Sequence, residues 1–351
     1  MKHYIAKFMQ RDDILKFAIV GCGHIGKRHA AMINSIPGCE LVALADTGGR
    51  EKLGIDAYPV PFFSSLDAML EAGPSIDVLC VATPNGLHEE HALKGLKTRH
   101  HVVIEKPMAL SKAGCEMMIQ EALQQHRQIF CVMQNRYSPP SVWLKELIQQ
   151  GILGKIFMVQ VNCYWNRDER YYRQGNWHGT KELDGGVLFT QFSHFIDILY
   201  WLFGDIEDIS ARFNNFSHQH LTGFDDTGLV NFNFRNGGMG CINFSTSVWD
   251  LNLESSITII AEHGTVKIGG QYMNKLEYCH IKDYVPPVLS DTEPPVNYGG
   301  YTGSAANHWY FFKHVASVLK GNAPIHAIAE EGLKTVEIIE RIYRSAVREL
   351  V

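Results

Sequence analysis

The sequence has little of what marks several specialised classes of protein. Its 351 residues include eight cysteines, and no two of them stand in a C-x-x-C pair, so neither a zinc site nor a redox motif is indicated. No apolar run approaches the ~20 residues that a membrane span needs. No basic run stands out and the formal net charge is −5, which argues against nucleic acid as the main partner. Residues 1–13 lack the apolar core of a signal peptide.

These absences leave an ordinary globular protein, with 46% hydrophobic and 20% charged residues. We expect it to be cytoplasmic, with reduced thiols, no metal, no nucleic acid partner and no membrane partner. The length predicts two domains. Strand–helix alternation breaks near residues 134–140, so we predict a dinucleotide-binding domain at 1–136. A substrate-binding and oligomerisation domain is predicted at 137–351.

A glycine-rich turn follows the first apolar run. Gly21, Gly23 and Gly26 form Gly-x-Gly-x-x-Gly, and a helix-forming run comes next. The first glycine permits a tight turn, the second lets a pyrophosphate approach the backbone, and the third lets the helix lie close to its strand. His24 and Ile25 begin this helix, whose free N–H groups would face the phosphates. The motif alone is weak, because glycine-rich turns are common.

A second apolar run, residues 40–45, strengthens the motif because it ends in Asp46, 20 residues beyond Gly26. A carboxylate at this place binds the adenosine ribose hydroxyls of NAD. It also repels a 2′-phosphate, which favours NAD over NADP, although Arg50 lies close in sequence. The alternative for Asp46 is a helix N-cap or a turn residue.

Two further predicted strands, residues 76–82 and 101–104, end in polar residues. The carboxyl ends of such strands are where a doubly wound sheet binds its ligand. His88 could instead cap a helix, and Glu105 with Lys106 could be a surface pair. Around these ends we place the remaining candidate cofactor contacts: Thr83, Pro84, Asn85, His88, Glu105, Lys106 and, after the next strand, Asn135.

The second half has a different periodicity, with strands joined by hairpins such as the one at Asn236-Gly237. We predict an α/β protein with an N-terminal Rossmann doubly wound parallel sheet. It is followed by a C-terminal α+β domain with an open, mainly antiparallel sheet. One helix at 187–203 is expected to lie across this sheet or beside the cofactor domain, and two helices at 308–319 and 329–350 close the chain.

Two segments of the second half contain candidate catalytic or substrate-binding residues. Gln191, His194 and Asp197 are spaced to lie near one helix face. A histidine among aromatic residues is more often a core residue than a catalyst. An Arg/Tyr-rich stretch offers Arg167, Tyr172 and Trp177, which suit a pyrophosphate and a base; a solvated loop or a subunit contact explains it equally well.

These motifs recur in an order that resembles the Gfo/Idh/MocA family of dinucleotide-dependent oxidoreductases. They are Gly-x-Gly-x-x-Gly, Thr83-Pro84-Asn85, Glu105-Lys106-Pro107, and Gly185-Gly186 followed by His194-x-x-Asp197. The resemblance implies an NAD-binding Rossmann domain and an open sheet that carries the substrate. It places the family's lysine and histidine on Lys106 and His194, and it implies a homo-oligomer, dimer or tetramer.

One position departs from part of the family. Inositol dehydrogenase and its closer relatives carry an aspartate four residues before the histidine, where Thr190 stands here. Asp197 is a possible substitute. The local pattern resembles instead the UDP-N-acetylglucosaminuronic acid 3-dehydrogenase branch, at Tyr171-Tyr172, Trp177, Asp184-Gly185-Gly186, Gln191 with His194, and the Tyr298–Tyr301 loop.

The resemblance implies an enzyme that oxidises a secondary hydroxyl of a sugar, in particular a nucleotide sugar at C3, with NAD. Lys106 would polarise the hydroxyl and His194 would act as the general base, or the two roles would be exchanged. The alternatives are a dehydrogenase of a free sugar or inositol-like polyol, and a non-catalytic NAD-binding regulator. The predicted substrate contacts are Lys106, Arg167, Tyr172, Trp177, Gln191, His194 and Tyr298.

Overall fold

The computed structural model describes residues 14–173, 175, 177–292, 294–295, 301–303, 307–325 and 328–348. The chain divides into two compact units. The N-terminal unit comprises Met1–Val132 and His308–Leu333, and the C-terminal unit comprises Met133–Asn307 and Lys334–Val351. The main break lies four residues before the predicted boundary. The predicted division also differs in a second respect, because residues 308–333 return to the N-terminal unit.

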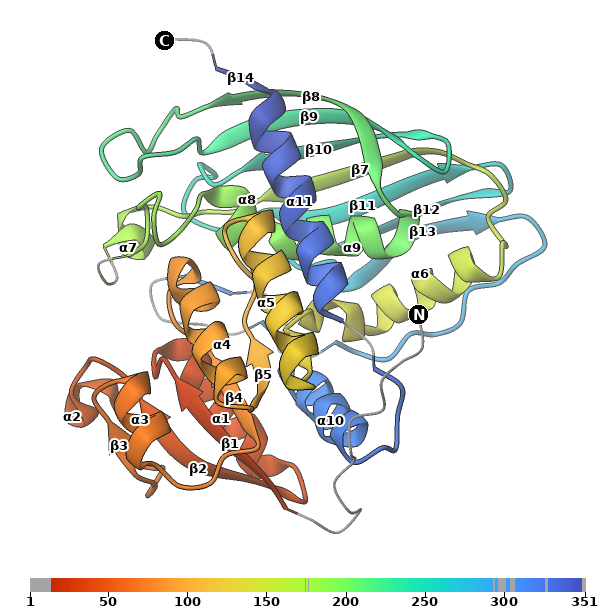
Figure 1. Ribbon diagram of the computed structural model, residues 1–351. Helices are drawn as coiled ribbons and strands as arrows, with labels where there is room; N and C mark the ends of the chain where they lie inside the picture. Colours follow the sequence, from red (N-terminus) through yellow and green to blue (C-terminus); the bar gives the residue numbers. More distant parts are fainter. Residues whose placement is uncertain are drawn as a thin grey trace. The chain divides into compact units, whose positions relative to one another are not determined.

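Six parallel strands form the sheet of the N-terminal unit, in the order β3-β2-β1-β4-β5-β6 (Figure 1). This is the doubly wound order, with its switch point between β1 and β4. The strands read as continuous apolar runs because helices cover both faces of such a sheet. Their bounds are β1 Leu15–Val20, β2 Cys39–Ala45, β3 Phe62–Phe63, β4 Val78–Val81, β5 His101–Ile104 and β6 Ile129–Cys131.

Two helices of this unit begin at a serine N-cap. Ser65 and Ser111 accept N–H bonds from the first turns of α3 and α5. Helix α10 joins the unit from far along the chain, because the Phe312 ring packs 6.2 Å from Phe17 and 4.8 Å from His29. The helices are α1 His24–Ser35, α2 Arg50–Leu53, α3 Leu66–Ala72, α4 His88–Lys97, α5 Lys112–Gln125 and α10 His308–Leu319, with a 3₁₀ turn η1 at Asn85–Leu87.

An eight-stranded sheet forms the C-terminal unit, in the order β13-β12-β11-β7-β10-β9-β8-β14. Only the β7–β10 and β8–β14 neighbours are parallel among these described strands, so the prediction of a mainly antiparallel sheet is confirmed. The bounds are β7 Ile156–Tyr164, β8 Ile206–Asn214, β9 Thr227–Phe234, β10 Met239–Ser245, β11 Glu254–Ala261, β12 Gly264–Gly269, β13 Lys275–Ile281 and β14 Ala346–Arg348.

One face of this sheet is buried and the other is open. Along β9, for example, Val230 and Phe232 are buried while Leu229 is exposed. Figure 1 shows α9 (Ser193–Phe203) and α11 (Ala329–Ser345) lying across the covered face. The shorter elements of the unit are η2 Gln134–Tyr137, α6 Pro139–Gln149, α7 Glu169–Tyr172 and α8 Val187–Thr190.

Two predicted helices differ from the observed ones. The helix expected at 187–203 is interrupted, because the N–H groups of Gln191 and Phe192 both bond to the carbonyl of Val187 and widen the turn. The last helix ends at Ser345 and is followed by β14. Among the described residues, none of the helices has the length and apolar character to span a bilayer.

Candidate active site

The glycine turn between β1 and α1 leaves no room for side chains at two of its positions. A Cβ on Gly21, whose φ is +91°, would lie 2.5 Å from the carbonyl oxygen of Ala82. A Cβ on Gly26 would lie 1.9 Å from the carbonyl oxygen of Gly21. Gly23 differs, because a Cβ there would meet nothing within 4 Å. The turn is therefore packed against the sheet beneath and faces open space at Gly23, as the approach of a pyrophosphate requires.

Helix α1 starts at this open position. Its N-cap is Gly23, and no side chain caps its first N–H groups. His24 and Ile25 form its first turn. A helix N-terminus with uncapped donors and the positive end of the helix dipole is suited to bind a phosphate.

The Asp46 carboxylate lies beside the same turn. Its Oδ2 accepts a bond from the Cys22 N–H at 2.6 Å, and its Oδ1 accepts one from the Gly48 N–H at 2.7 Å. Arg50 is directed elsewhere, since its guanidinium donates to the carbonyls of Tyr58 and Val60 at 2.5 and 2.9 Å. The acid is held at the turn, and the nearby cation is engaged by other groups.

His88 joins two strand ends and does not cap a helix. It is buried, and its ring nitrogens lie 2.9 Å from the carbonyl oxygen of Thr83 and 2.7 Å from that of Pro107. Burial lowers the pKa of His88 more than these carbonyls and the Glu105 carboxylate raise it. Thr83 in turn lies within reach of Gly21, whose added Cβ would stand 2.7 Å from the Thr83 nitrogen. Pro84 and Asn85 continue this segment, as the N-cap and first residue of η1.

Glu105 is buried, which rules out the surface pair with Lys106. One carboxylate oxygen lies 2.8 Å from His29 Nε2 and 3.5 Å from His308 Nε2. The other accepts the Lys106 backbone N–H at 3.2 Å. Burial by itself disfavours the carboxylate, but the hydrogen bonds from the two histidines outweigh it and hold the pKa of Glu105 well below its usual range. The residue before Lys106 is therefore fixed by its buried contacts. A cis peptide bond joins Lys106 to Pro107.

His29, Glu105 and His308 form the one group of potential metal ligands found among the described residues. A 2.8 Å separation between His29 Nε2 and Glu105 Oε1 is a hydrogen-bond distance. We interpret the cluster as a hydrogen-bonded support for Lys106. Neither histidine was singled out by the sequence; His29 lies three residues after Gly26 on the face of α1 that meets the sheet.

His194 lies in the first turn of α9, in the C-terminal unit. Its Nε2 stands 3.1 Å from the side-chain nitrogen of Gln134, and both residues are buried. Thr190 donates its hydroxyl to the carboxylate and the carbonyl of Asp184. Gln134 was not among the predicted residues, although it follows closely after β6 in the sequence.

Asp197, named above as a possible substitute for the missing aspartate, is held by a buried arginine and a threonine. It receives two bonds from Arg136, at 2.8 and 2.5 Å, and one from Thr335 at 3.3 Å. All of this group is buried. An aspartate and an arginine in paired contact satisfy each other's charge, so Asp197 belongs to an ion pair that ties α9 to η2.

Arg167 is buried among neutral groups. Its guanidinium donates to the side-chain oxygens of Gln191 and Asn252, at 2.7 and 3.2 Å, and to the carbonyls of Asn166 and Thr302, at 2.6 and 3.3 Å. Three aromatic rings, those of Trp165, Tyr171 and Tyr301, lie within 5.2 Å of it. Among the described residues no carboxylate pairs with this cation.

The other predicted substrate contacts in the C-terminal unit include Gln191, Tyr172 and Trp177. Gln191 also donates to the Tyr171 hydroxyl at 2.6 Å, and Tyr171 packs against Tyr172. Trp177 packs against His178, whose ring lies 4.4 Å from that of Tyr171. Tyr298 lies outside the described residues. Arg170 and Arg173 are different, since both are exposed and pair with nearby acids.

Asn135 is a buried residue whose side-chain nitrogen and oxygen have no hydrogen-bond partner among the described residues. Such a group is costly unless a ligand or water satisfies it.

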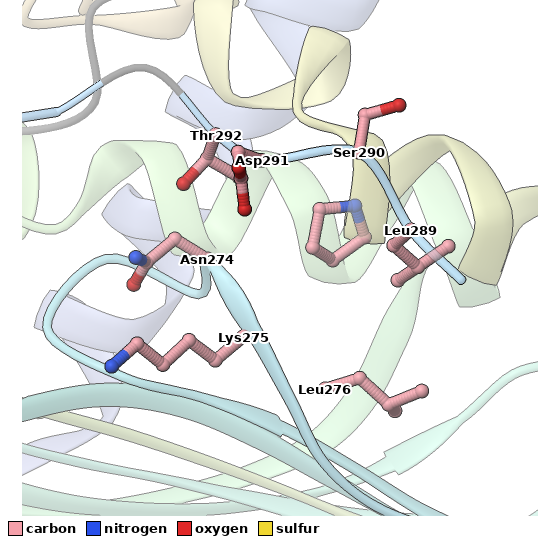
Figure 2. Close-up of a pocket in the computed structure, with 8 residues that line it drawn as sticks. Asn274, Lys275, Leu276, Leu289, Ser290, Asp291 and Thr292 are labelled. Carbon is pink, nitrogen blue, oxygen red and sulfur yellow. The ribbon is translucent and has the colours of Figure 1, made fainter.

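A pocket elsewhere in the C-terminal unit contains none of the predicted site residues (Figure 2). It is lined by the N-terminal end of α6, the first residues of β13 and the segment 289–292: Pro140, Asn274, Lys275, Leu276, Leu289, Ser290, Asp291 and Thr292.

Comparison with known proteins identifies the family. Residues 15–133 match the oxidoreductase family with an NAD-binding Rossmann fold, and residues 142–267 match the GFO/IDH/MocA C-terminal domain. The WlbA dehydrogenase from Bordetella pertussis, solved with NADH and UDP-GlcNAcA, is 33% identical, with a TM-score of 0.82 over 94% of this chain and 96% of that one. The chain belongs to the Gfo/Idh/MocA family.

Two more known proteins are similar to this chain. The WlbA dehydrogenase from Chromobacterium violaceum, also solved with NADH and UDP-GlcNAcA, is 29% identical, with a TM-score of 0.86 over 96% of this chain and 95% of that one. The inositol 2-dehydrogenase/D-chiro-inositol 3-dehydrogenase of Halalkalibacterium halodurans is 26% identical over 234 residues, 64% of this chain and 63% of that protein. The predicted family and its Rossmann domain are confirmed.

Proposed function

We propose that this Gfo/Idh/MocA protein is an NAD-dependent dehydrogenase that oxidises a secondary hydroxyl, at C3, of a nucleotide sugar resembling UDP-N-acetylglucosaminuronic acid. The likeness to the Bordetella pertussis dehydrogenase, which extends over 94% of the chain, carries the proposal. The retained Lys106 and His194 support an enzyme over a non-catalytic regulator, because a sensor needs no proton acceptor.

The residues of the N-terminal unit fit NAD. The uncapped start of α1 and the open space at Gly23 suit a pyrophosphate, and Asp46 suits the ribose hydroxyls. Arg50, bound to two carbonyls, is not poised to receive a 2′-phosphate, which favours NAD over NADP. Asn135, which belongs to the C-terminal unit, is a further proposed cofactor contact, because its amide offers a donor and an acceptor to a polar group of a ligand. When bound, the cofactor supplies a hydride acceptor.

Lys106 and His194 would deal with the proton and the developing charge. Lys106, held by Glu105 at its backbone, would donate a hydrogen bond to the substrate oxygen and stabilise negative charge on it. His194 would take the hydroxyl proton, a step worth about 10²–10⁴-fold in rate when the base is positioned.

Arg167 supports an anionic substrate. A buried guanidinium that has only neutral partners among the described residues leaves a positive charge uncompensated, which is costly in a protein interior. A pyrophosphate or a uronate carboxylate would compensate it. Inositol and free hexoses carry no such charge.

The test is absorbance of reduced nicotinamide, with purified protein, NAD and a substrate panel. The panel contains UDP-N-acetylglucosaminuronic acid, UDP-N-acetylglucosamine, free hexoses and inositol, with and without 2-oxoglutarate to reoxidise bound NADH. We expect turnover with the nucleotide uronate. Turnover restricted to a free sugar or inositol would overturn the nucleotide-sugar proposal. Tight NAD binding without any turnover would favour the regulator.

A further inference from the structure

The two side chains that accept hydrogen bonds from the Arg167 guanidinium are both amides. Gln191 presents its oxygen to Nε at 2.7 Å, and Asn252 presents its oxygen to Nη1 at 3.2 Å. Because a guanidinium only donates, the oxygen of each amide faces Arg167 and the nitrogen faces away. An amide oxygen carries no net charge, so these bonds hold the Arg167 side chain in place and leave its positive charge uncompensated.

The acids that lie close to Arg167 and Asn252 in the sequence pair with another cation. Asp168 and Asp250 both contact Arg170, at 2.7 and 3.2 Å, and the Arg170 side chain is 48% exposed. Arg167 is only 1% exposed, and burial lowers the pKa of its guanidinium. One N–H on its Nη2 has no acceptor among the described residues. A cation removed from water in this way strongly favours an anionic ligand.

We infer that Gln191 is a specificity-determining residue, because its neutral amide leaves the charge of Arg167 available to a diphosphate or a carboxylate of the substrate. The inference rests on the proposed function, in which Arg167 binds the anionic part of a nucleotide sugar. A glutamate at position 191 would fill the same space and compensate Arg167 from within the protein. The site would then lose its preference for an anionic ligand over a neutral sugar.

The surroundings of Gln191 allow this exchange without the loss of a hydrogen bond. Its amide nitrogen donates to the Tyr171 hydroxyl at 2.6 Å, and both side chains are buried. A hydroxyl donates as well as it accepts, so Tyr171 would donate to a carboxylate at the same point. Burial raises the pKa of Tyr171 well above its usual range, so the hydroxyl keeps the proton that this bond needs. Asn252 is less suited, because its nitrogen also donates to the carbonyl of Thr302 at 3.3 Å, which a carboxylate could not do.

The first experiment compares the melting temperatures of the full-length wild type, Gln191→Glu and Gln191→Met without ligand. Gln191→Glu should melt about 2–4 °C above the wild type, because its carboxylate compensates a cation that is already buried. Gln191→Met should melt below the wild type, because it removes a hydrogen bond from Arg167 and adds no charge. The control is Asn236→Asp, at the exposed turn between β9 and β10, which adds one negative charge elsewhere in the same unit and should leave the melting temperature unchanged.

The second experiment measures the dissociation constants of UDP and of glucuronate by calorimetry. Gln191→Glu should weaken the binding of the anion that Arg167 contacts by about 10–100-fold, because the carboxylate repels the ligand and compensates the cation. Gln191→Met keeps the charge of Arg167 uncompensated, so its dissociation constants should stay within about threefold of the wild type. A loss confined to UDP assigns the diphosphate to Arg167, and a loss confined to glucuronate assigns the carboxylate.

Two results would overturn the inference. One is a Gln191→Glu protein that melts no higher than the wild type, and the other is a Gln191→Glu protein that binds both probes as tightly as the wild type. Neither measurement requires turnover. Absence of turnover across the substrate panel would therefore count against the proposed function, while the melting temperatures and the two dissociation constants would still decide the role of Gln191.

Discussion

In the N-terminal unit the candidate cofactor residues follow the ends of parallel strands, whereas in the C-terminal unit the candidate catalytic residue depends on partners distant in the sequence. Gly21 follows β1, Asp46 follows β2 and Glu105 follows β5, so these residues lie at the same edge of the sheet. His194 meets Gln134, 60 residues away, and Arg167 meets Asn252, 85 residues away. A regular sheet makes the first site readable from motifs. The second is assembled by long-range packing, and motifs identify its members without their partners.

Loss of the lysine at the end of β5 should have the largest effect. Lys106→Met should lower turnover by about 10²–10⁴-fold, because it removes the group that stabilises charge on the substrate oxygen. NADH binding, measured by fluorescence titration, should stay within about threefold of wild type. Lys112→Met, at an exposed pair with Glu116, is the control. Full activity in Lys106→Met would remove this residue from the mechanism.

The buried cation of the C-terminal unit comes next. Arg167→Met should raise KM for the nucleotide sugar about ten- to hundredfold, since hydrogen bonds to charged groups contribute about 1.5–3 kcal/mol. Arg173→Met, an exposed pair with Glu169, should leave KM unchanged. Melting curves separate misfolding from lost binding. An unchanged KM in a folded Arg167→Met protein would contradict the anion role.

Substitution of the buried Glu105 tests whether its carboxylate is ionised and stabilises the segment that carries Lys106. Glu105→Gln should reduce the free energy of unfolding at pH 7 by about 1–3 kcal/mol, as measured by urea denaturation. The folded-state pKa of Glu105 is depressed, so its contribution is present above the ordinary value near 4.5 and is lost as pH falls below it. The wild type should therefore lose more stability than Glu105→Gln on acidification below pH 4.5. Parallel pH curves for the two proteins would argue against an ionised Glu105.

The smallest expected effect concerns cofactor choice. Asp46→Ser should reduce the preference for NAD over NADP by about tenfold, because removal of the carboxylate ends its repulsion of a 2′-phosphate. The ratio of kcat/KM for the two cofactors measures it, with Asp67→Ser on α3 as the control. A ratio that does not change would show that other groups set the preference.

Much of the N-terminal unit was predictable because its signals are local. A glycine turn followed by an acid 20 residues later has one physical purpose, and buried parallel strands read as apolar runs. The predictions failed at one local irregularity and at one contact between segments far apart in the sequence. The helix at 187–203 is broken by the two N–H groups that share the Val187 carbonyl, and helix α10 returns to the first unit to cover Phe17 and His29.

The sequence by itself determined the family, the two sheets and the identity of Lys106, His194 and Asp46 as candidates, because residue type and spacing along one strand or turn carry this information. The tertiary structure decided the partners. It directed Asp197 to Arg136, surrounded Glu105 with His29 and His308, and left Gln134 beside His194. Pairing of this kind depends on which buried polar groups meet when helices and strands pack, and a buried group takes the partner that folding brings within hydrogen-bond reach.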